Sequence, residues 1–164
     1  MTATLTAERV RELFEYDSDS GVLSWKVAVG KAKTGKQAGC LVPDGYVKVG
    51  ISGCIYAIHR VIWLYVHGHW PRHDIDHLNG DRADNRLANL RDVTRSVNSQ
   101  NLKRARVTSK SGLLGVSRHK GRKTFQAQIK TSGRSRHIGS YSTPEEAHSA
   151  YLDAKREEHP GCCI

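Results

Sequence analysis

A polar stretch over residues 72–102 limits most strongly what this chain can fold into. It is rich in Asn and Asp and lacks the continuous hydrophobic pattern of a helix or a strand. Apolar residues nevertheless recur in it, at Ile75, Leu78, Leu87, Leu90 and Val93. This composition is typical of a functional site that the neighbouring segments hold in place.

The segment before this stretch is predicted to form a small mixed module. Residues 6–15 have the cap and spacing of a short amphipathic helix, and residues 22–27 have the pattern of a strand. Two further strand-like runs, 46–51 and 54–58, flank a Ser-Gly turn and predict a hairpin. Residues 59–67 are strongly apolar and predict the main core helix of this module.

The segment after the polar stretch is predicted to form a second, smaller module. Residues 104–112 are basic and rich in Ser and Lys, which is typical of a linker. Short strands are predicted at 115–117, 125–130 and 136–141, and Pro144 with the acidic residues after it marks the start of a helix. Three short strands are marginally stable alone, so we expect this helix to cover their apolar face.

The charge of the chain is strongly positive and unevenly distributed. With 26 Lys and Arg against 16 Asp and Glu, the formal net charge of the 164 residues is +10 at pH 7. One segment holds eleven basic residues and no acidic one: Lys103, Arg104, Arg106, Lys110, Arg118, Lys120, Arg122, Lys123, Lys130, Arg134 and Arg136. Folding does not require such an imbalance, so we expect a polyanionic partner such as nucleic acid.

Membrane, secreted and zinc-knuckle proteins are not indicated. No run approaches the roughly 18 apolar residues of a membrane span, and the first residues lack the features of a secretion signal. The four cysteines, Cys40, Cys54, Cys162 and Cys163, form no Cys-x-x-Cys pair. We therefore expect a soluble, intracellular protein with free thiols.

Within the polar stretch, Asp76, His77 and Asn98 are the residues best suited to chemistry. Carboxylate and amide oxygens are the hard ligands that Mg²⁺ prefers, and an imidazole titrates near neutral pH and can activate a water molecule. Phosphodiester cleavage requires an activated water, a cation on the phosphate and a fixed geometry. Taken singly, these residues also suit a turn acid, a surface histidine and a loop amide, so the prediction depends on the whole ordered set.

The ordered set resembles the phage HNH homing endonucleases. The resemblance lies in the runs 58–63, 75–80, 84–86, 89–91 and 96–101 and extends over roughly residues 5–103. In that family, the motif folds as two antiparallel strands, a long loop and a helix around one divalent ion. The resemblance therefore implies a ββα-metal nuclease that cuts DNA.

The same resemblance implies roles for individual residues. Asp76 and Asn98 correspond to the metal ligands, and His77 corresponds to the general base. Asn89 corresponds to the middle Asn, which pins the loop and orients the base; Asn85 competes for this role. Asn101 is a weaker alternative to Asn98 as a metal ligand. His59 and Arg60, which precede the core helix, could serve either as structural support or as phosphate contacts.

The C-terminal module resembles the ethylene-response-factor (Apetala-type) DNA-binding domain of plants. The matching pieces are Gly115-Val116, residues 125–130, residues 137–141 and residues 143–151. In that family, the three-stranded sheet lies in the major groove of DNA. The resemblance implies DNA contacts from Arg118, Lys120, Arg122, Lys123, Gln126, Gln128, Lys130, Arg134, Arg136 and His137. This chain has Ser117 and His137 where the family often has Arg and Trp, so sequence preference is not inherited.

The sequence thus predicts an α+β protein with a ββα-metal HNH nuclease module, followed by a small three-stranded antiparallel sheet packed on one helix. The predicted domains are 1–103 for the nuclease with its helix and hairpin lead-in, 104–112 for a basic linker and 113–160 for the DNA-binding module.

The predicted function is a phage homing-type endonuclease that hydrolyses double-stranded DNA with Mg²⁺ or Mn²⁺, as a monomer or a dimer. We expect it in the cytoplasm of a bacterial or phage-infected cell. A non-catalytic, sequence-specific DNA-binding regulator with a relic HNH fold is the alternative, and RNA is a further candidate substrate.

Overall fold

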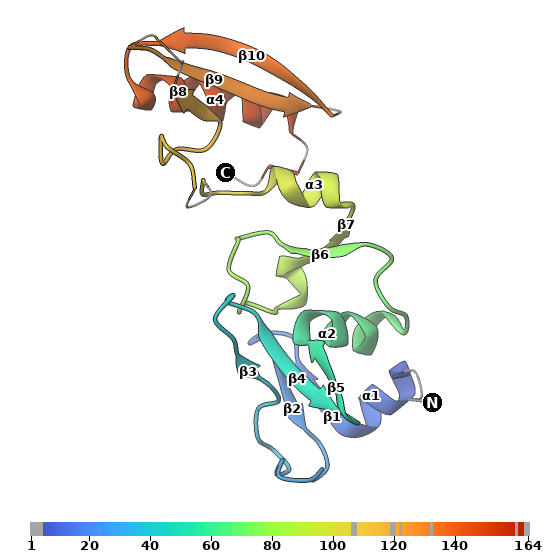
Figure 1. Ribbon diagram of the computed structural model, residues 1–164. Helices are drawn as coiled ribbons and strands as arrows, with labels where there is room; N and C mark the ends of the chain where they lie inside the picture. Colours follow the sequence, from blue (N-terminus) through green and yellow to red (C-terminus); the bar gives the residue numbers. More distant parts are fainter. Residues whose placement is uncertain are drawn as a thin grey trace. The chain divides into compact units, whose positions relative to one another are not determined.

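The computed structural model divides into two units, Met1–Arg95 and Ser96–Ile164, whose ribbons are drawn in Figure 1. Each unit has a hydrophobic core of its own. The structure describes residues 5–105, 108–118, 121, 123–131, 133–159 and 161–162. No helix formed by these residues has the length and apolar character needed to cross a membrane.

The first unit begins with a short helix and a two-stranded sheet. Helix α1 (Ala7–Leu13) is capped by the Thr6 side chain, which accepts a hydrogen bond from the Arg9 amide at 3.3 Å. Strand β1 (Phe14–Asp17) then pairs antiparallel with β2 (Val22–Trp25).

The prediction that the first helix extends to residue 15 is therefore wrong. Phe14 is fully buried opposite Trp25, with their ring centroids 4.4 Å apart. Glu15 follows Phe14 in the same strand. Cross-strand aromatic pairing outweighs the local helical spacing at these residues.

A three-stranded antiparallel sheet and the core helix complete the scaffold of the first unit. The strands follow the order β3 (Cys40–Leu41), β4 (Val47–Ile51) and β5 (Cys54–Ala57). As predicted, β4 and β5 form a hairpin, and its turn residues Ser52 and Gly53 have φ values of 49° and 82°. Helix α2 (Ile58–His67) follows directly and ends at Gly68, which adopts the left-handed conformation that glycine favours.

The polar stretch forms a second hairpin. Strand β6 (Asp74–His77) pairs antiparallel with β7 (Leu90–Val93), and the connecting loop ends in a short 3₁₀ turn, η1 (Leu87–Asn89). Helix α3 (Arg95–Gln100) follows β7.

The second unit is a three-stranded antiparallel sheet covered by one helix, as the alternation of its sequence predicts (Figure 1). The elements are β8 (Val116–Arg118), β9 (Phe125–Thr131), β10 (Arg134–Tyr141) and α4 (Pro144–Glu158). Ala127 and Ile129 of β9 are buried with Tyr151 of α4 in one core. Thr143 and Glu146 form a capping box that starts the helix.

The division between the units falls before the predicted domain end at residue 103. Residues after α3 are anchored within the second unit, because Lys155 Nζ donates to Leu102 O at 2.5 Å. The Gly161 amide likewise donates to Gln100 Oε1 at 3.0 Å. Contacts from the far end of the chain thus assign this segment to the second unit, which the local sequence does not indicate.

Gly21 connects the first sheet to the loop of the second hairpin. It has a φ of 73°, and a Cβ atom there would lie 2.4 Å from Arg86 N and 2.6 Å from the carbonyl carbon of Asn85. The backbone of the loop can approach the β1–β2 turn this closely only because residue 21 has no side chain.

We predict that Gly21→Ala destabilises the protein more than Gly35→Ala. Gly35 has a nearly equal φ of 75° but nothing within 4 Å of its Cβ position, so it controls for backbone strain. Strain should lower the free energy of unfolding by about 1 kcal/mol at both positions, and overpacking should add about 1–3 kcal/mol at residue 21. Urea unfolding measures both variants, and equal losses would contradict the close approach.

Candidate active site

Asp76 and His77 lie at the end of β6, where both side chains are buried, with 6% and 4% of their surface exposed. Asp76 faces Arg91 across the β6–β7 ladder. Arg91 Nε and Nη2 both donate to Asp76 Oδ2, at 2.9 and 2.7 Å. This charge-assisted pair fixes the orientation of the carboxylate.

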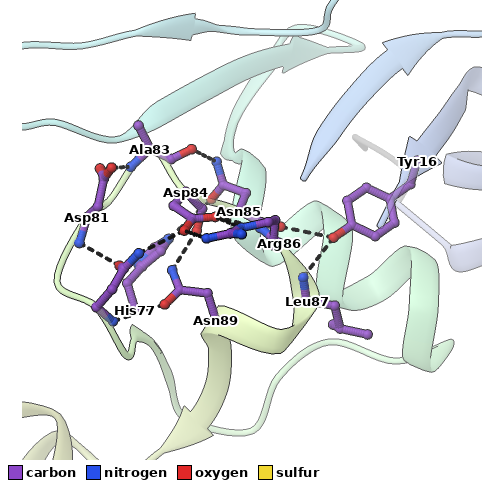
Figure 2. Close-up of polar contacts among 10 residues, drawn as sticks. Tyr16, His77, Asp81, Ala83, Asp84, Asn85, Arg86, Leu87 and Asn89 are labelled. Carbon is purple, nitrogen blue, oxygen red and sulfur yellow. Dashed lines mark hydrogen bonds and ion pairs between the residues drawn. The ribbon is translucent and has the colours of Figure 1, made fainter. Parts of the chain in front are cut away.

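The imidazole of His77 is oriented by Asn85 from the loop (Figure 2). His77 Nε2 lies 3.2 Å from Asn85 Oδ1, and Asn85 Nδ2 donates to Ala83 O at 3.0 Å. Because this second bond fixes which end of the amide is oxygen, the His77 proton belongs on Nε2 and the lone pair on Nδ1. Burial lowers the pKa of His77 despite the Asn85 hydrogen bond, so burial favours the neutral ring.

Asn89 holds the two ends of the loop together. Its Oδ1 accepts a hydrogen bond from the Asn79 amide at 3.0 Å, and its Nδ2 donates to Asp84 O at 2.8 Å. The Leu78 amide also donates to Asn89 O at 2.9 Å. The two functions that the sequence analysis gave to one middle Asn are thus divided geometrically, since Asn89 bridges the loop and Asn85 contacts the imidazole.

The carboxylate of Asp84 accepts hydrogen bonds from two other side chains of the loop. Arg86 Nε and Nη2 donate to its two carboxylate oxygens at 2.8 and 2.6 Å, and Asn79 Nδ2 donates at 2.7 Å. The Arg86 hydrogen bonds are the largest influence on this carboxyl group and lower the pKa of Asp84 to about 2.

The first sheet anchors the loop through Tyr16 (Figure 2). The Tyr16 hydroxyl donates to Asn85 O at 3.0 Å and accepts from the Leu87 amide at 2.9 Å. Burial raises the pKa of this phenol. The anchor links β1 directly to the residue that orients His77.

Aromatic contacts from two other segments surround the imidazole. The ring centroid of His59, on α2, lies 5.2 Å from that of His77, and the two rings are nearly perpendicular at 87°. The Tyr46 ring lies 5.2 Å from His59 and 6.1 Å from His77. Arg82 of the loop stacks over Tyr46 at 4.7 Å and donates to Asp44 O at 2.6 Å. Sequence reasoning missed Tyr46 and Arg82. The only local signal near Tyr46 is the turn at Pro43-Asp44-Gly45, and nothing near Arg82 indicates its contact with that turn.

The structure brings together Asp76, His77, Asn85 and Asn89 in the first unit. His59 is buried beside them, whereas Arg60 donates from Nη1 to His73 O at 3.1 Å and supports the segment before β6. The other two candidate ligands, Asn98 on α3 and Asn101 after it, belong to the second unit.

The chemistry of the candidate ligands fits a hard divalent ion. Among the described residues, no group of three His, Cys, Asp or Glu side chains gathers as a metal cluster. Mg²⁺ does not require such a cluster, because it commonly keeps several waters and binds through one or two carboxylates together with substrate phosphate. A buried, rigidly oriented Asp76 is a suitable single carboxylate for this mode.

The outward face of the second unit's sheet is polar. Ala127 and Ile129 of β9 pack towards α4, so the intervening Gln126, Gln128 and Lys130 lie on the opposite face. His137 pairs with Gln128 across the ladder and shares that face.

The remaining predicted DNA contacts are placed differently. Arg118 and Arg136 pair with Phe125 and Ile129, which puts them on the helix side of the sheet, and Arg136 also forms an ion pair with Glu158 of α4. Arg134, at the start of β10, and Lys123, shortly before β9, are both exposed. Lys120 and Arg122 lie outside the described residues.

We predict that Asp84 titrates near pH 2 in the folded protein and that Arg86→Gln raises its pKa towards the ordinary value of 3.8. Since the folded-state pKa is depressed, the stability that this carboxylate contributes is present above pH 3.8 and is lost as pH falls towards about 2. A ¹³C NMR titration of the side-chain carboxyl measures both proteins. An unchanged pKa in the variant would exclude Arg86 as the cause.

Comparison with known protein families finds one that matches residues 56–100, described as HNH endonuclease. The matched residues include β6, β7 and α3, and with them Asp76, His77 and Asn98. Comparisons with curated proteins and with solved structures found no match. The match therefore supports a nuclease, which acts on nucleic acid. HNH nucleases generally use divalent metal ions.

Proposed function

We propose that this protein is a metal-dependent endonuclease that hydrolyses phosphodiester bonds of double-stranded DNA. The observation that carries the proposal is the hydrogen bond between His77 Nε2 and Asn85 Oδ1, at the end of a strand that also bears Asp76. This hydrogen bond places the ring proton on Nε2, and burial lowers the pKa of His77, so the ring is held in the neutral form that a general base requires. The HNH endonuclease match at residues 56–100 supports the same reaction.

In the proposed mechanism, His77 removes a proton from the attacking water and Asn85 holds the ring in the required tautomer. Asn89 keeps the loop closed, so that the position of Asn85 does not drift during turnover. Fixed geometry of this kind is a large part of catalysis, because a misplacement of about 1 Å can lower a rate by about 10²-fold.

Asp76 and Asn98 would hold the divalent ion, Mg²⁺ or Mn²⁺. A bound ion supplies positive charge that offsets the charge developing on the phosphate and the leaving oxygen. Arg91 contributes by fixing the Asp76 carboxylate, since both of its donors bind Oδ2. Asn101 is the alternative to Asn98.

We predict that His77→Ala lowers the rate of plasmid cleavage by at least about 10²-fold and leaves the DNA dissociation constant nearly unchanged. Loss of the base should slow the chemical step without removing binding surface. The measurement is single-turnover cleavage with Mg²⁺ or Mn²⁺, with EDTA as the metal-free control. His69→Ala, which removes an exposed histidine of the same unit, is the matched control.

Three results of this assay would redirect the proposal. Wild-type cleavage that is insensitive to EDTA would exclude a metal-dependent reaction. Binding without cleavage under all metal conditions would favour the alternative, a sequence-specific DNA-binding regulator with a relic HNH fold. Faster digestion of RNA than of DNA, side by side, would change the substrate class.

The proposed biological role follows from the resemblance to phage homing endonucleases. Such an enzyme acts in the cytoplasm of a bacterial or phage-infected cell and cuts at a defined DNA sequence. Mapping the ends of products from a phage or host genome tests this role, since scattered ends would contradict a homing function.

We further propose that the sheet of the second unit binds the DNA substrate, as its resemblance to the ethylene-response-factor domain implies. Charge supports this assignment. The first unit has thirteen basic and eleven acidic residues and the second has thirteen and five, so +8 of the formal +10 belongs to the second unit. On the outward face, Gln side chains can pair with adenine edges, and Lys130 can bind guanine or phosphate.

We predict that Lys130→Gln weakens DNA binding and reduces the slope of log K against log salt concentration by about 0.9, the value for loss of one phosphate contact. Arg156→Gln is the matched control, because Arg156 is an exposed basic residue on α4 rather than on the sheet face. Fluorescence anisotropy at several salt concentrations measures both slopes. Equal slopes for Lys130→Gln and the wild type would contradict a phosphate contact by Lys130.

A further inference from the structure

His59 is a buried polar residue of the first unit, and its surroundings do not satisfy the hydrogen-bonding capacity of its imidazole. It is the second residue of α2, and only 7% of its surface is exposed. Its Nδ1 is fully enclosed and has no hydrogen-bond partner among the residues that the structure describes. An unpaired buried nitrogen lowers the stability of the fold, and an apolar ring of similar shape would avoid this loss.

The location of His59 distinguishes it from other enclosed polar atoms. Trp63 Nε1, on the same helix, also lacks a partner among the described residues, but its ring packs against His67. The His59 ring instead packs edge-on against His77, with centroids 5.2 Å apart, and against Tyr46. The imidazole of His59, whose unpaired nitrogen lowers the stability of the fold, therefore lies directly beside His77, the proposed base.

Chemistry indicates the form that this imidazole takes. Burial, followed by the nearby His77 and Arg60, lowers the pKa of His59 to about 3, so the ring is neutral near pH 7. A neutral imidazole has one donor and one acceptor. Among the described residues, the enclosed Nδ1 has no hydrogen-bond partner, so we assign the proton to Nε2, the tautomer that does not bury an N–H without an acceptor.

We propose that His59 is a second catalytic histidine of this site, a neutral donor whose Nε2–H binds an oxygen of the scissile phosphodiester while His77 activates the water. The inference rests on the proposed nuclease function. Without a positive charge, His59 stabilises the reacting phosphate by a fixed dipole, and it does not place a second cation beside the imidazolium that forms on His77.

The test compares His59→Phe and His59→Gln with the wild type. Phe keeps a ring and removes both nitrogens, so the melting temperature should stay equal or rise while single-turnover cleavage falls by about 10²-fold. The DNA dissociation constant should change by less than about twofold, because one neutral hydrogen bond contributes little to a charged interface. Gln restores a neutral donor, so its cleavage rate should lie between those of His59→Phe and the wild type.

Trp63→Phe is the matched control and should cut at the wild-type rate. The proposal is overturned if His59→Phe cuts as fast as the wild type, if its activity falls only in parallel with its melting temperature, or if Gln gives no faster cleavage than Phe. Failure of the nuclease function is distinguishable, because the wild type would then cut no DNA or His77→Ala would cut as fast as the wild type.

Discussion

The loop between β6 and β7 must satisfy its own polar groups, and the candidate site depends on this constraint. Asn85 and Asn89 are buried at 4% and 7% exposure, where an unpaired amide is unfavourable by about 1–3 kcal/mol. Both amides are paired within the loop, and Asn79, Asp81 and Asp84 each accept a hydrogen bond from a backbone amide two residues later. A segment with little hydrophobic content thereby adopts a defined conformation.

Pairing within the loop does not determine where the loop lies, and three parts of the scaffold provide that information. The Tyr16 hydroxyl binds the backbone on both sides of Arg86, and Gly21 allows the same backbone to approach closely. On the other side, Arg82 is held by the turn that precedes β4. Because these contacts come from segments that are distant in sequence, the orientation of His77 depends on the folding of the whole first unit.

The sequence predicted well those features that depend on local patterns. The β4–β5 hairpin, the core helix and the sheet-and-helix module follow from hydrophobic periodicity and turn residues, which act over a few positions. Strand β1 was missed because Phe14 continues the helical spacing of α1, and only its partner Trp25 reveals the strand. The division between the units likewise depends on distant contacts, since Lys155 and Gly161 bind residues that precede them by more than fifty positions.

For the candidate site, residue types predicted Asp76 and His77, and the resemblance to HNH endonucleases added Asn85 and Asn89. The structure brings these four residues together. Neither the residue types nor the resemblance separated the contacts of Asn85 and Asn89, because either amide has the chemistry to orient an imidazole. Nothing in the sequence connects Tyr46 with His77, and the sequence predicts His59 only as structural support or a phosphate contact. The contribution of Asn98 and the DNA contacts of the second unit remain predictions.

The distribution of charge suggests why the chain is built as two units. The candidate site contains a compensated pair, Asp76 and Arg91, and buried histidines whose pKa values are lowered, so it has little excess positive charge of its own. Most of the formal positive charge lies in the second unit instead, so the attraction that we propose for a polyanion would come from that unit. Within the first unit, the pairing of Arg91 with Asp76 compensates a positive charge that would otherwise oppose protonation of a neighbouring base. Most of the charge proposed to attract a polyanion and the histidine proposed as base thus belong to different units.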